Sequence, residues 1–300
     1  MKLATIRREE GARVALVDAE RGRVWPVDPP AWAPKSFGPS SFGMTDVIRG
    51  WRDLRDGLRP EGDGIPLSQV DLLAPIPRPQ RNLMCVGKNY HDHAHEFTRS
   101  GFDSSASSAK DAIPEHPIIF TKLPETVIGP GAAIRYPHGV SDQIDYEVEL
   151  VVVIGRAGRD IPKAQAMDHV FGYTIANDVT ARDIQARHKQ WFLGKSLDSF
   201  CPLGPWIVTA DEVDLSDMSV RSWVNGELRQ NSNTRDLIFD VPTLIETMSR
   251  GITLQPGDLI LTGTPAGVGL GFTPPKFLKP GDRVKLEIGG IGVLENTLEG

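Results

Sequence analysis

The sequence feature that most constrains the fold is the stretch Gln143–Gly155, QIDYEVELVVVIG, which has the pattern of a β-strand. β-Branched residues dominate its second half and a glycine ends it, as is typical of strands. Because side chains alternate across a strand, Asp145, Glu147 and Glu149 should project to one face. The residues past Glu149 are apolar on both faces, so we expect the strand to be buried.

The acidic residues of this strand allow two interpretations. Buried carboxylates need a positive partner, because the loss of their hydration is otherwise too unfavourable. Two acidic oxygen donors at positions i and i+2 suit a hard divalent cation such as Mg²⁺ or Mn²⁺. A solvated strand end that happens to be acidic explains the same residues without a metal. The strand alone does not decide between the two.

Length and composition are those of an ordinary globular protein. A chain of 300 residues can form one large or two ordinary domains. Its net charge of −6 argues against a general nucleic-acid binder. The N-terminus lacks the apolar region of a signal peptide, and no apolar run approaches the ~20 residues of a membrane helix. Cys85 and Cys201 form neither a CxxC motif nor a disulfide framework, so we expect a reducing, cytoplasmic setting.

The first quarter of the chain is predicted to be a small β-rich module over residues 1–75. Short strands are broken by glycine-containing turns, and we expect a helix near Met44–Gly57 and another strand near Leu67–Leu73. The module has no evident chemical motif, so packing or framing a cleft is its default role. The proline-rich stretch at 74–82 cannot be regular for long. We therefore place a domain boundary there, which gives domains 1–75 and 76–300.

A candidate catalytic pair follows at 82–97, where a predicted buried strand leads through a turn at Gly87 into a helix over Tyr90–Phe97. His93 and Glu96 lie three residues apart and so share a helix face. A carboxylate that orients an imidazole suits removal of a proton from water. The competing explanation is that both are polar residues on an exposed helix surface, and the segment alone does not distinguish the two.

Three later segments carry structural expectations. Residues 98–115 are rich in Ser, Ala and Gly, which fits either a lid over the catalytic helix or an ordinary surface loop. Ala164–Val170 is predicted to be helical, followed by a strand over Phe171–Asn177. The stretch 254–272 is predicted to be a strand and then a glycine-rich turn, whose backbone amides could converge on a substrate carboxylate or enolate.

Several familiar motifs are absent from the sequence. The GKS at 194–196 is not a phosphate loop, because that motif needs glycine at position 189, where this chain has Lys189. The glycine-rich run at 267–271 lacks the GxGxxG spacing of a dinucleotide site. There is no GxSxG, no HExxH and no Cys/His zinc spacing. These absences disfavour serine hydrolases, zinc proteases and nucleotide-binding folds.

Five separated motifs stand out along the chain: NYxxHxxE at 89–96, DYEVEL at 145–150, NDVTARDIQ at 177–185, GKSLD at 194–198 and TGTPAGVG at 262–269. They resemble those of the fumarylacetoacetate hydrolase family, and they occur in that family's order. The resemblance covers about residues 76–298. Within the family, the stretches at 187–190 and 271–282 are most similar to bacterial members described as oxaloacetate decarboxylases or acylpyruvate hydrolases.

The resemblance implies a fold and a set of site residues. The fold is an α+β, β-rich protein with a mixed β-sandwich or β-roll catalytic domain, beside the small N-terminal β-rich domain, in a homodimer. One Mg²⁺ or Mn²⁺ per subunit would be held by Glu147, Glu149 and Asp178. The predicted catalytic residues are His93 and Glu96 as a water-activating pair, with Lys195 at the substrate oxygen or the developing charge. The predicted substrate-binding residues are Lys122, Arg182, Gln185 and Thr264.

The implied activity is metal-dependent cleavage of the C3–C4 bond of a 2-oxo acid through an enolate. In acylpyruvate hydrolysis, His93 would activate water for attack on C4; in oxaloacetate, loss of CO₂ would yield the same enolate. A first alternative is isomerisation or hydration of an unsaturated 2-oxo dicarboxylate such as 2-hydroxyhepta-2,4-diene-1,7-dioate. A second alternative is a binding or scaffold protein built on an enzyme shell. The expected partner is a small 2-oxo acid, with no nucleic acid and no membrane.

Overall fold

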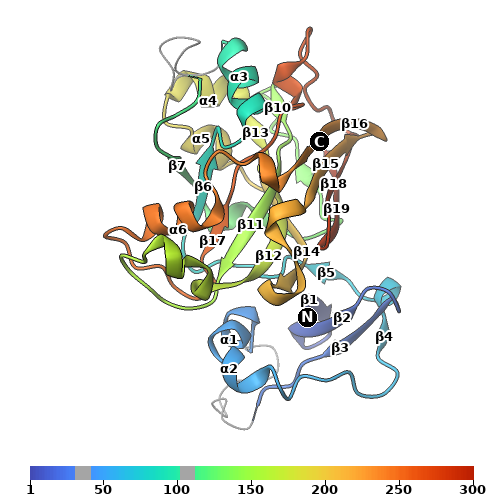
Figure 1. Ribbon diagram of the computed structural model, residues 1–300. Coiled ribbons are helices and arrows are strands. Elements are labelled where there is room, and N and C mark those ends of the chain that lie inside the picture. Colours follow the sequence, from blue (N-terminus) through green and yellow to red (C-terminus); the bar gives the residue numbers. More distant parts are fainter. Residues whose placement is uncertain (31–41, 102–111) are drawn as a thin grey trace.

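The computed structural model describes residues 1–30, 42–101 and 112–300, and one large mixed sheet forms its centre (Figure 1). Most neighbouring strands of this sheet are antiparallel, whereas β17 and β6 are parallel. In order across the sheet the strands are β4 (Ile65–Pro66), β3 (Arg23–Pro26), β2 (Gly11–Asp18), β1 (Lys2–Arg8), β14 (Cys201–Thr209), β12 (Val170–Asn177), β11 (Val148–Ile154), β17 (Leu259–Leu261), β6 (Leu83–Gly87) and β7 (Ile118–Lys122), with β5 (Leu72–Leu73) paired to β1 and β8 (Val127–Ile128) paired to β14.

The central strand β11 is buried along its whole length, as the sequence predicts. It lies between β12 and β17 and pairs with both. Its two faces enter different hydrophobic cores: Leu150 and Val152 pack in one, and Val151 and Val153 in the other. A strand with apolar residues on both faces is stable only between two layers, which explains the run of Val, Leu and Ile.

The predicted strand Gln143–Gly155 is wrong in one respect, because it is interrupted. Residues Ile144–Asp145 form the short strand β10, which pairs with β13 (Thr180–Ala181), and β11 begins only at Val148. At the break, two backbone N–H groups donate to side chains instead of to a neighbouring strand. The Tyr146 N–H donates to the Asp145 carboxylate at 2.9 Å, and the Glu147 N–H donates to Asn177 Oδ1 at 3.0 Å. Side-chain acceptors there replace the sheet hydrogen bonds that a regular strand would make.

A second sheet covers one face of the first. Its inward residues Val220 and Leu286 share a core with Leu150 and Val152 of β11. Together the two sheets form a β-sandwich, so the predicted α+β, β-rich class is confirmed. The strands of this sheet, in order, are β16 (Glu227–Asn233), β15 (Ser219–Val224), β18 (Arg283–Ile288), β19 (Gly292–Glu299) and β9 (Ile134–Arg135).

The N-terminal residues form the β-rich module that the sequence predicts, and they continue the main sheet. Strand β1 pairs antiparallel with β14, which joins β1–β4 to the catalytic part. The predicted strand Leu67–Leu73 is mostly wrong: Leu67–Gln69 is a 3₁₀ turn and only β5 pairs with β1. Helices α1 (Met44–Arg49) and α2 (Trp51–Leu54) lie within the predicted helical region. The boundary between residues 75 and 76 stays a prediction.

Three short helices gather beside β6 and β7, at the end of the molecule away from the N-terminal module (Figure 1). They are α3 (His91–Arg99), α4 (Arg182–His188) and α5 (Phe192–Lys195). Helix α6 (Val241–Ser249) covers the side of the sheet together with Lys163–His169, which is a 3₁₀ helix rather than the predicted α-helix. Most of the proposed lid at 98–115 lies outside the described residues. No helix in the described residues is both long and apolar enough to cross a membrane.

Candidate metal centre and active site

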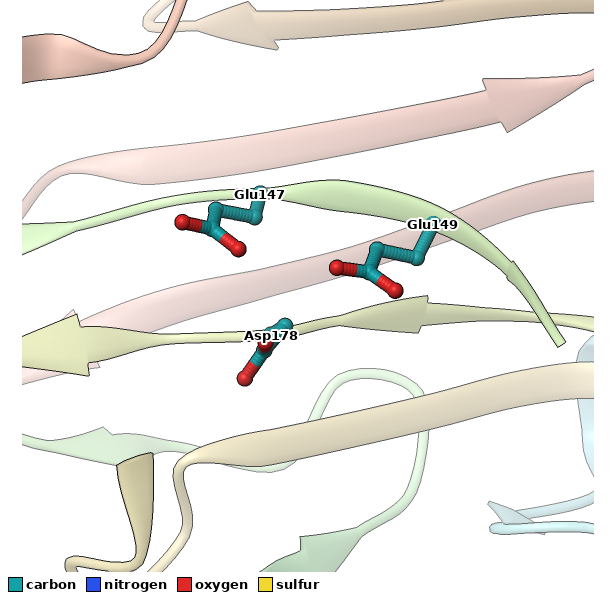
Figure 2. A group of neighbouring side chains, drawn as sticks. All are labelled: Glu147, Glu149 and Asp178. Carbon is teal, nitrogen blue, oxygen red and sulfur yellow. The ribbon is translucent and has the colours of Figure 1, made fainter. Parts of the chain in front are cut away.

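Three buried carboxylates converge from two neighbouring strands (Figure 2). Glu147 precedes β11 by one residue, Glu149 lies within β11, and Asp178 follows the last residue of β12. The register of β11 with β12 brings them together, because Val148 faces Asn177 and the Asp178 N–H donates to the Glu147 carbonyl at 2.9 Å. Each can offer one oxygen within 4.8 Å of the others, which is close enough for one ion to bind all three.

Two lysines compensate these charges. Lys195 Nζ lies 2.8 Å from Glu147 Oε2 and 2.6 Å from Asp178 Oδ2. Lys122 Nζ lies 2.7 Å from Asp178 Oδ1 and also donates to the carbonyls of Val179 and Lys195. All three donors of Lys122 are therefore used within the protein. The prediction that Lys122 binds substrate finds no support in this geometry, which instead makes Lys122 a holder of Asp178.

The carboxylates differ in their electrostatic environment. Burial alone would raise the pKa of Glu147, but the charges of Lys195 and Arg182 outweigh it and hold that pKa at about 2. Burial, then the charges of Asp178 and Glu147, raises the pKa of Glu149 well above its usual range. Glu149 is thus the least compensated acid of the three. An all-oxygen, net anionic donor set of this kind fits Mg²⁺ or Mn²⁺.

The predicted pair His93 and Glu96 is in contact. The two side chains lie on one face of α3, with His93 Nδ1 3.1 Å from Glu96 Oε2. The other carboxylate oxygen, Oε1, accepts from the Gly267 N–H at 3.0 Å. Glu96 is therefore held on both oxygens, and His93 is buried against Phe97. An imidazole bonded to a carboxylate through Nδ1 has Nε2 left for a ligand.

Arg182, Gln185 and Thr264 lie beside the carboxylates. Arg182 Nη1 is 2.7 Å from Glu147 Oε1 and 3.2 Å from Gln185 Oε1, both reached from the first turn of α4. Thr264 Oγ1 accepts from Gln230 Nε2 at 2.7 Å. Because that bond occupies a lone pair of the hydroxyl oxygen, the Thr264 hydroxyl hydrogen can donate to a ligand.

These groups border one small cleft. Seven of the predicted site residues border the cleft. Glu96, Asp178 and Lys122 do not border it and instead bind lining residues, Glu96 to His93 and the other two to Lys195. The aromatic residue Trp191 also borders it. The lining residues are Val86, Gly87, Lys88, His93, Phe97, Phe120, Glu147, Glu149, Arg182, Gln185, Trp191, Lys195 and Thr264.

The glycine-rich turn after β17 binds anions, but they are the protein's own carboxylates. The N–H of Gly263 donates to Glu149 at 2.7 Å, and that of Gly269 to Asp145 at 2.6 Å. Gly267 holds Glu96 in the same way. The expectation that these amides contact a substrate carboxylate or enolate is therefore wrong for these three, because acidic side chains of the chain itself already occupy them.

Sequence reasoning missed two residues that shape the site. Asp145 forms an ion pair with Arg182, and Gln230 donates a hydrogen bond to Thr264. The sequence predicts that Asp145 lies on the same strand face as Glu147, and this alternation was the signal that could have placed Asp145 at the site. Gln230 lies in a hairpin strand far from every motif, and nothing in the sequence links it to Thr264.

Comparison with known proteins gives the family. Residues 82–299 match the model of the fumarylacetoacetate (FAA) hydrolase C-terminal family, and the chain belongs to that family. It is 52% identical over 233 residues to oxaloacetate tautomerase YisK of Bacillus subtilis. The aligned region covers 77% of this chain and 74% of that protein.

Solved structures agree with this assignment. The chain is similar to a fumarylacetoacetate hydrolase from Exiguobacterium antarcticum, with 40% identity, a TM-score of 0.81, and coverage of 100% of this chain and 99% of that one. It is also similar to maleylpyruvate hydrolase from Sphingobium sp. SYK-6 in complex with manganese(II) and pyruvate. That match has 31% identity, a TM-score of 0.76, and coverage of 100% and 99%. The family resemblance and fold predicted from the sequence are confirmed, and the family is one of enzymes.

Proposed function

We propose that this chain is a divalent-metal-dependent enzyme of 2-oxo acid chemistry and that its reaction is the enol–keto tautomerisation of oxaloacetate. The observation that carries the proposal is that Glu147 and Glu149 line one cleft together with His93. Asp178 completes the carboxylate cluster and Glu96 holds His93 from outside the lining. Tautomerisation moves one proton between the C2 oxygen and C3, which needs a base beside a stabilised enolate. The 52% identical relative named oxaloacetate tautomerase supports this choice of reaction.

The three carboxylates would hold one Mg²⁺ or Mn²⁺. A bound ion would supply Lewis-acid stabilisation of negative charge at the C2 oxygen of the substrate. The related hydrolase solved with manganese(II) and pyruvate supports both the metal and a small 2-oxo acid as ligand. Oxygen donors accept either ion, so we propose that both support activity.

His93 would carry the proton. With Glu96 ionised and accepting at 3.1 Å, Nδ1 would carry the proton and Nε2 would have the lone pair of a base. Nε2 would remove or return the proton at C3. Lys195, whose ammonium already lies between Glu147 and Asp178, would stabilise negative charge that develops at the same end of the cleft.

Cleavage of the C3–C4 bond is the second candidate, and it is the reaction predicted from the sequence. The observation that favours it is the same orientation of His93 by Glu96, because this pair can activate water as well as move a carbon-bound proton. The solved relative named maleylpyruvate hydrolase supports it. Both reactions pass through an enolate, so product analysis separates them. The homodimer and the cytoplasmic location stay predictions.

The test measures two products from one substrate. Metal-stripped protein receives enol-oxaloacetate with and without Mg²⁺ or Mn²⁺, while the ultraviolet absorbance of the enol and the release of pyruvate are followed separately. We expect metal-dependent loss of the enol that is much faster than pyruvate release. Reactions without protein, and with Glu149→Gln, correct for catalysis by free metal.

Further substrates decide between the candidates. Acetylpyruvate and fumarylpyruvate should yield little pyruvate if tautomerisation is the main reaction, and pyruvate at rates matching enol loss if cleavage is. A protein that binds metal but accelerates neither enol loss nor pyruvate release would refute the proposed function. Asp258→Asn is a matched control, because it removes a largely buried aspartate paired with Arg81 at 2.7 Å, outside the residues that line the cleft.

A further inference from the structure

Asp145 is a buried carboxylate whose four hydrogen bonds fix it in place. Its Oδ1 accepts from the backbone N–H groups of Gly269 at 2.6 Å and Tyr146 at 2.9 Å. Its Oδ2 accepts from Leu270 N at 3.0 Å and from Arg182 Nε at 2.8 Å. The side chain is fully buried and does not border the cleft. Three of the donors belong to the backbone, so the carboxylate cannot follow Arg182 if that side chain moves.

Arg182 is equally buried, and it does border the cleft. Its Nε is bound to Asp145, and its Nη1 to Glu147 and Gln185. Its Nη2 is buried and has no hydrogen-bond partner among the described residues. A buried guanidinium nitrogen without a partner is unfavourable, because the lost hydration is not replaced. Nitrogens of Arg13 and Arg229 are also buried without a partner among the described residues, but of these three arginines only Arg182 borders the cleft. A donor of this kind in the wall of a cleft is suited to an anionic ligand.

We propose that Asp145 is a positioning residue, which orients Arg182 so that Nη2 binds a carboxylate of a 2-oxo dicarboxylate substrate. The guanidinium is planar, so fixing Nε on Asp145 also fixes the directions of Nη1 and Nη2. Without Asp145, Arg182 would be held only at Nη1, by Glu147 and Gln185, and the guanidinium could turn about that nitrogen. Asp145 also supplies negative charge that keeps a cation stable beside a divalent-metal site. This inference rests on the proposed function.

The test compares Asp145→Asn with the wild type in the manganese-loaded protein. Asparagine keeps the size of the side chain and an acceptor oxygen, but it loses the charge that binds Arg182. We expect the Kd for oxalate, a dianion with two adjacent carboxylates, to rise about tenfold, while the Kd for Mn²⁺ changes less than about threefold. With oxaloacetate, KM should rise about tenfold and kcat should change less than about threefold.

A double variant shows whether Asp145 acts through Arg182. Arg182→Lys keeps the positive charge but lacks the planar set of guanidinium N–H donors, so it should weaken oxalate binding at least as much as Asp145→Asn. The two changes together should be no worse than Arg182→Lys alone, because they disturb one interaction. Asp258→Asn, which breaks the distant pair with Arg81, should leave oxalate binding unchanged.

Two results would overturn the inference: wild-type oxalate binding in Asp145→Asn, or losses in the two single variants that simply add. If Asp145→Asn does not fold, Gly269→Ala takes its place, since a Cβ there would lie 2.7 Å from Asp145 Oδ1 and 2.5 Å from the Lys276 carbonyl oxygen, and so would displace the carboxylate together with the turn that holds it. That variant must then reproduce the weaker oxalate binding. Because oxalate binding needs no turnover, a wild type without tautomerase activity refutes the proposed function and leaves the role of Asp145 measurable.

Discussion

Replacing Gly271 by alanine should impair the His93–Glu96 pair without touching either residue. A Cβ at position 271 would lie 2.7 Å from Glu96 Cγ, and closer still to its Cδ and Oε1. The backbone of Gly271 is not in the left-handed region, so alanine adds no backbone strain there. The clash therefore acts first on the Glu96 side chain, which supplies the three atoms nearest to the new Cβ.

The size of the effect follows from the contacts of Glu96. Ordinary contact begins at 3.4 Å, so the carboxylate must retreat by about 1 Å or more. Its bond to His93 Nδ1 is 3.1 Å long and would then exceed the ~3.5 Å limit of a hydrogen bond. A hydrogen bond to a charged group contributes about 1.5–3 kcal/mol, which corresponds to a loss of roughly 10- to 150-fold in kcat.

The assay is steady-state turnover of enol-oxaloacetate, with calorimetric Mn²⁺ binding as a check that the carboxylates are intact. Gly57→Ala is the control, because its Cβ would meet only the Leu54 carbonyl at 3.6 Å. In a double variant with Glu96→Ala, Gly271→Ala should cause no further loss, since its target is gone. A folded Gly271→Ala protein with wild-type kcat, or one that impairs Glu96→Ala further, would refute this reasoning.

Three further predictions concern the same cleft. His93→Ala should lower turnover by about 10²- to 10⁴-fold with metal affinity retained, and unchanged turnover would exclude His93 as the base. Lys122→Met should destabilise the metal-free protein by about 3–5 kcal/mol in denaturant unfolding, because Asp178 loses a buried counter-charge; a loss below about 1 kcal/mol would contradict this. Because the pKa of Glu149 is raised, the folded, metal-free protein keeps this side chain protonated at pH values where the unfolded chain has lost the proton. The stability that this proton contributes is lost as the pH rises above 4.5, the ordinary pKa of a glutamate. Glu149→Gln should therefore flatten the decline in thermal unfolding temperature between pH 5 and 8 and abolish stabilisation by Mn²⁺; an unchanged slope would contradict it.

The central strand and the acidic cluster were predictable because they depend on local periodicity. The alternation of Glu147 and Glu149, followed by Val151 and Val153, determines both the buried strand and the face that carries the acids. The contact of His93 with Glu96 likewise follows from helix spacing. The role of Asp178 came from the family resemblance, because the pairing of β11 with β12 joins residues that are far apart in the chain.

Other features depend on tertiary contacts that no local pattern encodes. The break between β10 and β11 depends on Asn177, which lies 30 residues further along the chain and accepts from the Glu147 N–H. The Asp145 carboxylate, which accepts from the adjacent Tyr146 N–H, is held in place by the distant Gly269 and Leu270. Lys122 was predicted to bind substrate, but its ammonium binds Asp178 and two backbone carbonyls. Only the three-dimensional arrangement shows which acceptors satisfy it.

The glycine-rich turn shows why this site uses backbone amides as well as cations to hold its acids. Lysine beside a carboxylate compensates its charge, as Lys122 and Lys195 do for Asp178. A backbone N–H orients a carboxylate but carries only a partial charge, so Gly263 fixes Glu149 without supplying a full counter-charge, and that compensation is left to a bound cation. Glu96 on Gly267 is likewise fixed while its charge still acts on His93. The turn can therefore fix a metal ligand and the partner of a base in position without neutralising either, which a third lysine could not do.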